Sequence, residues 1–392
     1  MEFEFTPEQK KLQEKAREFG ERWRPFAAEW DEKDHISNMK EIIDDARECG
    51  FLGMTVPKKY GGQDLTVLDW TITVEEIARA AQSWVPGDCV FMTSGPGPSV
   101  CMRSPNEEVK RKYLPSIVNG EKLCMVTMTE PKYGSAMTDM ETSATADGDY
   151  YIINGSKRLI TGAGEIELYS TFVRFGGIPG AAGIGAIMLE RGMPGFVFGK
   201  NPKLIGLRGV PHGELYFENC RMPKENLLFP EGHFRELMEA FNMERMHNLI
   251  LSVALAEASY DEAVKYVQAR QQFGRDIIEF QGIQWAIADM WVRIQAARWL
   301  MYMAAATAVD GKYPKALEVS TAKLFANDIG TWVSQRASYL QGSDGFSNDF
   351  PAERLTRDLL IMPVAGGTPE ILRNVIAAQL FPQRKFSQRK GQ

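Results

Sequence analysis

Glu244 lies in the segment of this chain that offers the clearest acid–base chemistry, Asn242-Met243-Glu244-Arg245. A carboxylate that a helix carries into a buried site has a raised pKa, which suits a general base near neutral pH. The alternative is that Glu244 pairs with Arg245 and does no chemistry. His247 follows one turn later and could hydrogen-bond near such a site, although an ordinary helix histidine is the favoured interpretation.

A second set of polar residues consists of hydroxyls near the ends of β-like segments. Thr129 lies in Met128-Thr129-Glu130-Pro131, which precedes Gly134-Ser135, and Thr161 lies in Leu159-Ile160-Thr161-Gly162. A threonine at a strand end is usually structural when it stands alone. These two occur together inside one β-rich region between helical regions, and that combination gives them functional interest.

Other features of the sequence indicate less chemistry. The glycine-rich stretch 176–185 lacks the lysine and the helix start of a phosphate-binding loop, so it is expected to be a hairpin loop. The four histidines and five cysteines have no metal-ligand spacing, and no metal site is predicted. Scattered cysteines of this kind fit buried thiols in a reducing compartment.

The elements that must position these residues follow the order helices, strands, helices. Thr6-Pro7-Glu8-Gln9 predicts a capped helix start, and helical patterning continues to about residue 120. Short apolar segments from about residue 121 to 236 predict a β-barrel or sandwich, with a hairpin where the run from Tyr150 ends in Asn154-Gly155. Apolar spacing of three and four over residues 249–270 and 283–309 predicts long helices packed in a bundle.

Bulk composition limits the class of protein. The chain has 392 residues, a hydrophobic fraction of 44% and a formal net charge of −6. This is a globular composition, and its charge argues against general nucleic-acid binding. The N-terminus has no signal-peptide pattern, and no apolar run approaches the roughly 18 residues of a membrane span. We therefore expect a cytoplasmic protein that binds neither membrane nor nucleic acid.

Taken together, the motifs resemble the acyl-CoA dehydrogenase superfamily over essentially the whole chain. Besides the two threonine segments, the resemblance rests on these landmarks: Gly206-Leu207-Arg208-Gly209, Met222-Pro223-Lys224-Glu225-Asn226, Arg270-Gln271-Gln272-Phe273-Gly274, Gln281, residues 342–346, and residues 364–373 (VAGGTPEILR). It implies a mixed α and β fold with three domains. These are an N-terminal helical domain (1–120), a central β domain (121–236) and a C-terminal four-helix bundle (237–392).

The resemblance also implies FAD and an oligomer. By position, Thr129 and Thr161 should hydrogen-bond the flavin ring, and Ser135 should lie near the dinucleotide or the pantetheine of CoA. The residues that should reach FAD from the C-terminal domain, some of them in a neighbouring subunit, are Arg270, Phe273, Gln281, Gly342 and Thr368. An arginine suits a pyrophosphate because its fork matches paired oxygens. Because one subunit completes the FAD site of its neighbour, a homotetramer is expected.

The family chemistry interconverts an acyl-CoA and its 2,3-enoyl-CoA. A base removes the proton alpha to the thioester, hydride passes from the beta carbon to flavin N5, and donors stabilise the enolate oxygen. Most members carry the catalytic glutamate where this chain has Gly366. Gly366 keeps the backbone N–H for the enolate oxygen, and Glu244 is the substitute base, at a position that branches resembling isovaleryl-CoA dehydrogenase use.

Further positions bear on the substrate. Asn242 is expected to touch the pantetheine arm, and Arg245 to lie at the substrate. Ala365, Gly366 and Val126 are small where the family often has larger residues, which favours a bulky, branched or polar acyl group. Departures from the usual flavin motifs, among them Lys132-Tyr133, Ala136, Tyr339 and Ser343, put individual FAD contacts in doubt.

Three functions are compatible with the sequence. The leading one is a dehydrogenase, with electron-transfer flavoprotein as partner, or the reverse reaction in the manner of crotonobetainyl-CoA reductases, which share a Gly-Gly pair here. The second is a non-redox lyase resembling sulfinopropionyl-CoA desulfinases, although Trp84-Val85 stand where those enzymes use an arginine. The third is a CoA-ester-binding protein without catalysis.

Overall fold

The N-terminal third of the molecule is helical. The structure, a computed structural model, describes residues 4–309, 311–384 and 386. The Thr6 hydroxyl accepts from the Gln9 amide at 3.2 Å and the Gln9 side chain accepts from the Thr6 amide at 3.1 Å, so the predicted capped start is confirmed. The helices that follow are α1 (Pro7–Trp23), η1 (Arg24–Phe26), α2 (Ala27–Lys33), α3 (Met39–Glu48), η2 (Lys58–Tyr60), α4 (Val67–Ala81), α5 (Val85–Ser94), α6 (Pro96–Arg103) and α7 (Glu107–Val118).

The middle of the chain forms one eight-stranded sheet in the order β6-β7-β3-β2-β4-β5-β8, with β1 added beside β4. Its strands are β1 (Cys124–Thr127), β2 (Ser143–Asp147), β3 (Tyr150–Thr161), β4 (Leu168–Phe175), β5 (Ile184–Glu190), β6 (Phe196–Phe198), β7 (His212–Pro223) and β8 (Leu227–Phe229). Only two residue pairs join β2 to β4, so the sheet has two halves. Among the described residues, the pairing does not close into the barrel that the sequence allowed.

The hairpin predicted at Asn154-Gly155 is wrong. Strand β3 runs straight through this dipeptide, and the turn lies at Gly148 and Asp149, between the paired residues Asp147 and Tyr150. Gly155 serves a close approach instead, since a Cβ there would lie 2.6 Å from the Cα of Thr142. The register of β3 against β7 also shifts here, so the glycine marks a bulge and not a turn.

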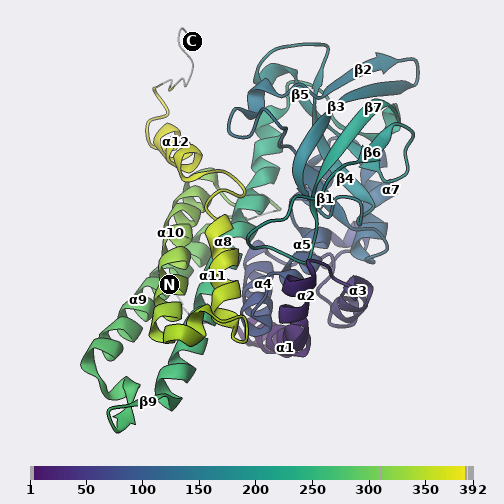
Figure 1. Cartoon of the computed structure of the whole chain (residues 1–392). Helices are drawn as coiled ribbons and strands as arrows, with labels where there is room; N and C mark the ends of the chain where they lie inside the picture. The colour runs from purple at the N-terminus through teal and green to yellow at the C-terminus, as the bar shows by residue number, and fades with distance from the viewer. Residues whose placement is uncertain (1–3, 310, 385, 387–392) are drawn as a thin grey trace.

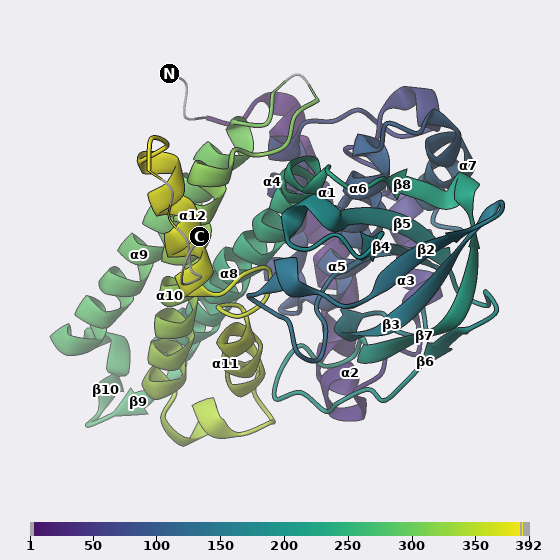
Figure 2. The same ribbon diagram turned by 90° about the horizontal axis from the view of Figure 1, so that it is seen from above.

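Helices return with α8 (Phe234–Ala269), which runs through the centre of the molecule (Figure 1). Most of its residues from Leu237 to Ser259 are buried, as expected for a helix packed on all sides. The remaining elements are β9 (Gln271–Gln272), β10 (Arg275–Asp276), η6 (Ile277–Glu279), α9 (Gln281–Ala306), α10 (Ala316–Leu340), η7 (Gly342–Phe346), α11 (Pro351–Ile361) and α12 (Pro369–Leu380). Helices α9, α10 and α12 lie on the side of α8 away from the sheet (Figure 2).

The secondary structure changes near each of the two expected domain boundaries. The helices stop at Val118, the strands begin at Cys124, and α8 begins at Phe234. The boundaries at 120/121 and 236/237 therefore stay a prediction that falls close to the observed changes of structure. The outermost residues of the first and last proposed domains, 1–3 and 387–392, lie outside the described residues.

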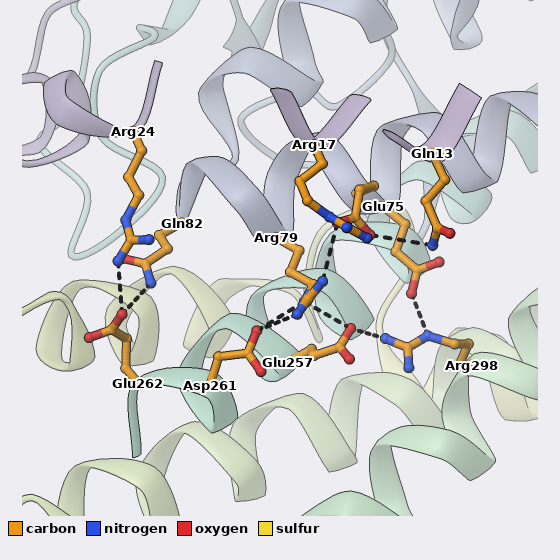
Figure 3. A network of polar contacts seen from close by, with 11 residues as sticks. Gln13, Arg17, Arg24, Glu75, Arg79, Gln82, Glu257, Asp261, Glu262 and Arg298 are labelled. Carbon is orange, nitrogen blue, oxygen red and sulfur yellow. Dashed lines mark hydrogen bonds and ion pairs between the residues drawn. The ribbon is translucent and has the colours of Figure 1, made fainter. Parts of the chain in front are cut away.

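A polar network joins the N-terminal helices to α8 and α9 (Figure 3). Arg298 of α9 forms ion pairs with Glu75 of α4, at 2.6 Å, and with Glu257 of α8. Arg79 of α4 contacts Glu257 at 3.4 Å and Asp261 at 2.8 Å. The charged groups at the centre are largely buried, so the two helical regions are held together by paired charges as well as by apolar packing.

Candidate active site

Glu244 projects from α8 toward the loop of residues 362–368. Gly366 in this loop has φ +63, and a Cβ built on it would lie 3.3 Å from Cγ of Glu244 and 3.6 Å from Cε of Lys323. A side chain at 366 would therefore begin against Cγ, in the middle of the Glu244 side chain. Helix α8 at Glu244 and the loop at Gly366, which are far apart in the sequence, therefore pack against each other here.

Lys323 of α10 is fully buried beneath this loop. Its ammonium donates to the carbonyl of Gly367 at 3.2 Å and to that of Met362 at 3.5 Å. Asn327, one turn later, also donates to the Met362 carbonyl, at 3.0 Å. Helix α10 therefore holds both ends of the loop that carries Gly366.

The pKa of Glu244 is raised to about 7. Burial is the main cause, the charge of Asp88 on α5 adds to it, and the charge of Lys323 opposes it. Burial likewise lowers the pKa of Lys323 to about 7, against the attraction of Glu244 and with the repulsion of Arg245. A carboxyl group with this pKa is available as a base at neutral pH and as an acid slightly below it.

Arg245 does not neutralise Glu244. Its Nη1 donates to the side-chain oxygen of Asn242 at 2.7 Å, and its Nε is buried without a partner among the described residues. Burial lowers the pKa of Arg245 to about 10. The Asn242 amide in turn donates to the Pro314 carbonyl at 2.9 Å. Both residues are thus buried beside Glu244, and their expected contacts with the substrate stay predictions.

His247, on the next turn of α8, forms a buried pair with Asp88 of α5. Nε2 of His247 lies 2.8 Å from Oδ1 of Asp88, and the imidazole stacks on Phe91 with ring centroids 3.7 Å apart. The sequence favoured an ordinary helix histidine at 247. The structure instead joins it to a carboxylate that acts electrostatically on Glu244.

Changing the two charged neighbours of Glu244 should move its titration in opposite directions. Lys323→Met removes the cation that lowers the pKa of Glu244, so the acid limb of kcat/KM should move to higher pH than in the wild type. Asp88→Asn removes the anion that raises this pKa, so the limb should move to lower pH. The measurement is the pH dependence of flavin reduction at limiting substrate, which reports the free enzyme.

The other ionisable side chains near Glu244 are those of Arg245 and His247 on α8 and His212 on β7, and both variants keep them. If the acid limb of kcat/KM moved equally and in the same direction in both variants, the substitutions would act through a general loss of packing. No displacement in either variant would show that Glu244 does not control the limb.

Thr161 is connected to this site through strand β7. It ends β3 and pairs with His212, whose ring lies 5.7 Å from that of Trp84 just before α5. Asp88 follows one turn later on α5 and raises the pKa of His212, which burial lowers overall. The end of β3 therefore meets the helices that surround Glu244.

Thr129 lies in a loop that a buried ion pair fixes. The Lys157 ammonium, on β3, donates to the Met128 carbonyl and to the Glu130 carboxylate, each at 3.0 Å. Glu130 also accepts from the amides of Glu141 and Thr142, at 2.6 and 2.9 Å. Burial lowers the pKa of Lys157 to about 8, while Glu130 acts to raise it. The loop with Thr129 is thus held from both sides.

Two hydroxyls near strand ends fit a flavin ring. Thr129 and Thr161 are half-buried, and their hydroxyls have no hydrogen-bond partner among the described residues. Free hydroxyls on a rigid rim can donate to and accept from the polar edge of such a ring. Ser135 lies in an exposed loop, where it is open to a dinucleotide or to CoA. Val126 is half-buried on β1, and Ala365 and Thr368 lie half-buried on either side of Gly366 and Gly367.

The other predicted flavin residues lie elsewhere. Arg270, Phe273 and Gln281 surround the β9–β10 hairpin, at the end of the helical bundle far from the sheet (Figure 1). Phe273 is 93% exposed. Tyr266, one turn before Arg270, donates to Asp344 of η7 at 3.0 Å, so Gly342 belongs to the same end. One chain therefore does not bring these residues to Thr129 and Thr161.

Three residues important to this site were missed by reasoning from the sequence: Asp88, Lys157 and Lys323. The signal for Asp88 is an acidic residue in the otherwise apolar stretch from Val85 to Phe91. Lys157 and Lys323 carry no such signal, because each resembles a solvated lysine until its partners are known. Among the described residues, no group of three or more histidine, cysteine, aspartate or glutamate side chains is arranged to hold a metal ion.

Comparison with known proteins identifies the family of this chain. Three family models match the chain: the acyl-CoA dehydrogenase N-terminal domain at residues 6–121, the middle domain at 124–220 and the C-terminal domain at 234–381. The chain therefore belongs to the acyl-CoA dehydrogenase family, whose members are FAD-dependent oxidoreductases.

Individual relatives within the family differ in activity. The chain is 34% identical to the short-chain specific acyl-CoA dehydrogenase of Clostridium acetobutylicum, over 97% of this chain and 100% of that one. It is 33% identical to the 3-sulfinopropanoyl-CoA desulfinase of Advenella mimigardefordensis, over 99% and 97%. The butyryl-CoA dehydrogenase structure from Megasphaera elsdenii superposes with a TM-score of 0.90, at 33% identity and over 97% and 100% of the two chains.

Proposed function

We propose that this protein interconverts an acyl-CoA and its 2,3-enoyl-CoA, with Glu244 as the base. The observation that carries the proposal is the meeting of Glu244 and Gly366 at one point, 3.3 Å apart between Cγ and a Cβ built on the glycine. Glu244 takes the proton from the alpha carbon, and its pKa of about 7 lets it do so at neutral pH. FAD, when bound, accepts the hydride from the beta carbon.

The remaining residues act by positioning. The Gly366 amide serves as a donor to the enolate oxygen, and Lys323 holds its loop through the Gly367 carbonyl. Thr129 and Thr161 hold the flavin ring, and Ser135 lies at the dinucleotide or the pantetheine. Asn242, Arg245, Ala365 and Val126 surround the thioester and acyl group. Small side chains at 365 and 366 leave room for a bulky, branched or polar acyl group.

The test is the visible spectrum of the holoenzyme under anaerobic conditions while a panel of saturated acyl-CoAs is added. Bleaching of the flavin band by a member of the panel supports the dehydrogenase half-reaction and identifies an acyl group. Re-oxidation of the reduced enzyme by the matching enoyl-CoA measures the reverse direction, for which a Glu244 with a pKa of about 7 can also supply the proton.

The lyase alternative requires a group that holds an anionic acyl end. The region where the sequence suggested such a group carries Trp84 and, one turn later, the buried carboxylate of Asp88. A sulfinate there would meet a like charge. Release of sulfite from 3-sulfinopropanoyl-CoA without flavin bleaching would establish the lyase in place of the dehydrogenase, and stable binding without either reaction would establish a binding protein.

Assembly into a homotetramer fits the exposed apolar face of α9 and α10. Large side chains are exposed along these helices: Trp285, Trp291, Val292, Trp299, Met303, Phe325 and Trp332. A second copy of the chain covers this face, and its Arg270, Phe273, Gln281 and Gly342 complete the FAD site of its neighbour. Sedimentation of the holoenzyme over a range of concentrations tests this, with loss of FAD on dissociation as the expected result.

Electron-transfer flavoprotein is the proposed acceptor of electrons from the reduced enzyme. None of the helices in the described part of the chain has the length and apolar content of a membrane span. All five cysteines are free thiols, which fits a cytoplasmic location.

A further inference from the structure

Asp88 is a buried carboxylate with one oxygen that the protein leaves unsatisfied. Oδ1 lies 2.8 Å from Nε2 of His247, whereas Oδ2 is buried and has no hydrogen-bond partner among the described residues. The residue is 4% exposed. A carboxylate oxygen that is buried without a hydrogen bond is unfavourable, so Oδ2 requires a donor.

His247 satisfies one oxygen of Asp88 and leaves the other without a partner. Nδ1 of His247 is also buried without a partner in the described part of the chain. Among the described residues, the imidazole contacts Asp88 through Nε2 and Oδ1, so it does not satisfy Oδ2.

Asp88 lies close to the point where the proposed function places the reacting carbons, beside Glu244. His247 follows Glu244 by three residues, or about 4.5 Å along the axis of α8, which equals a few carbon–carbon bonds. Helix α5 places Asp88 and Phe91 against His247, and Asp88 is near enough to Glu244 to raise its pKa. Lys323 opposes the charge of Glu244, while Asp88 has no cation among its hydrogen-bonding partners.

We infer that Asp88 is a specificity-determining residue, and that the acyl site selects an acyl group whose far end donates a hydrogen bond, as an ammonium or a hydroxyl does. This inference rests on the proposed function, because that function places the alpha and beta carbons beside Glu244. Such a group satisfies Oδ2 of Asp88. An acyl group that ends in a carboxylate or sulfinate is repelled, and one that ends in a methyl leaves Oδ2 unsatisfied.

The test measures dissociation constants with holoenzyme that carries Glu244→Gln, so that binding is separated from turnover. The probes share a chain length and differ at the far end: 5-aminopentanoyl-CoA has a donor, hexanoyl-CoA has a methyl, and glutaryl-CoA has an acceptor. A shorter pair, 4-hydroxybutanoyl-CoA and pentanoyl-CoA, covers a nearer contact. We expect the donor probe of at least one pair to bind at least tenfold more tightly than its methyl partner, and glutaryl-CoA to bind most weakly.

Asp88→Asn is the matched variant, because it keeps the volume and can keep the acceptor for His247. It replaces the free carboxylate oxygen with an amide donor, so the preference should invert toward glutaryl-CoA. Equal affinities within each set, or a donor preference that survives Asp88→Asn, would overturn the inference. Measurement of the probe set on the enzyme with the native Asp88 stands even if Asp88→Asn does not fold.

Failure of the proposed function gives a different result. If Glu244→Gln still allows substrate to bleach the flavin, Glu244 is not the base. The affinities are then measured with the flavin reduced in advance, which blocks turnover, and they still report whether Asp88 selects the acyl end.

Discussion

Glu244→Gln should lower the rate of flavin reduction by about 10²–10⁴-fold, the range typical of a general base. Glutamine keeps the size of the side chain and the neighbours Lys323 and Asp88, so substrate should still bind. The measurement is single-turnover bleaching of the flavin by a substrate found in the acyl-CoA panel. A variant that reduces its flavin at the wild-type rate would contradict the assignment of Glu244.

The position of Gly366 supplies a control that tests the geometry as well as the residue. A Cβ at 366 would lie 3.3 Å from Cγ of Glu244 and 3.6 Å from Cε of Lys323, so a glutamate placed there reaches the same region. We expect Glu244→Ala to be inactive and the double variant Glu244→Ala, Gly366→Glu to recover part of the rate. Recovery should be incomplete, because φ +63 costs a non-glycine residue about 1–2 kcal/mol.

Arg298→Met should cause the largest loss of stability among single changes in the polar network of Figure 3. It leaves Glu75 and Glu257, which are 5% and 10% exposed at the side chain, without their shared cation. Breaking a buried pair in this way costs about 3–5 kcal/mol. The measurement is the thermal midpoint of the holoenzyme at fixed protein and FAD concentrations.

Arg24→Met in the same network is the control. Its pair with Glu262 is more exposed, with Arg24 43% accessible, and Gln82 also donates to Glu262 at 2.7 Å. An exposed pair contributes at most about 1 kcal/mol. Equal falls in the midpoint for the two variants would show that burial of the charges at Arg298 does not govern the contact between the helical regions.

Much of the architecture could be predicted from the sequence because its signals are local. Thr6 and Gln9 form a capping box within four residues, and the apolar spacing of α8 and α9 is visible along each helix. The hairpin at Asn154-Gly155 could not be predicted correctly for the opposite reason. Gly155 is required by the close approach of Thr142, the residue before β2, and no local sequence pattern contains that contact.

The residues of the candidate site also fall into those that a local motif identifies and those that only tertiary packing brings together. Glu244 was identified because a family motif places a carboxylate at that position, and Gly366 because the same motif lacks one. Asp88 and Lys323 acquire their roles only because α5 and α10 pack against α8. The apolar neighbours of Asp88 signal its burial but not its partner, and Lys323 has no such signal. Their pKa effects on Glu244 belong to the tertiary structure alone.

The convergence of Glu244 and Gly366 also bears on how the family can change over generations. A chain that gained a second carboxylate at 366 would hold two acids at one point, and a single proton shared between them would leave one able to act. Either glutamate could then be lost without loss of the reaction. Relocation of the base from one segment to the other therefore has a route through functional intermediates, and the left-handed conformation of Gly366 biases which of the two survives.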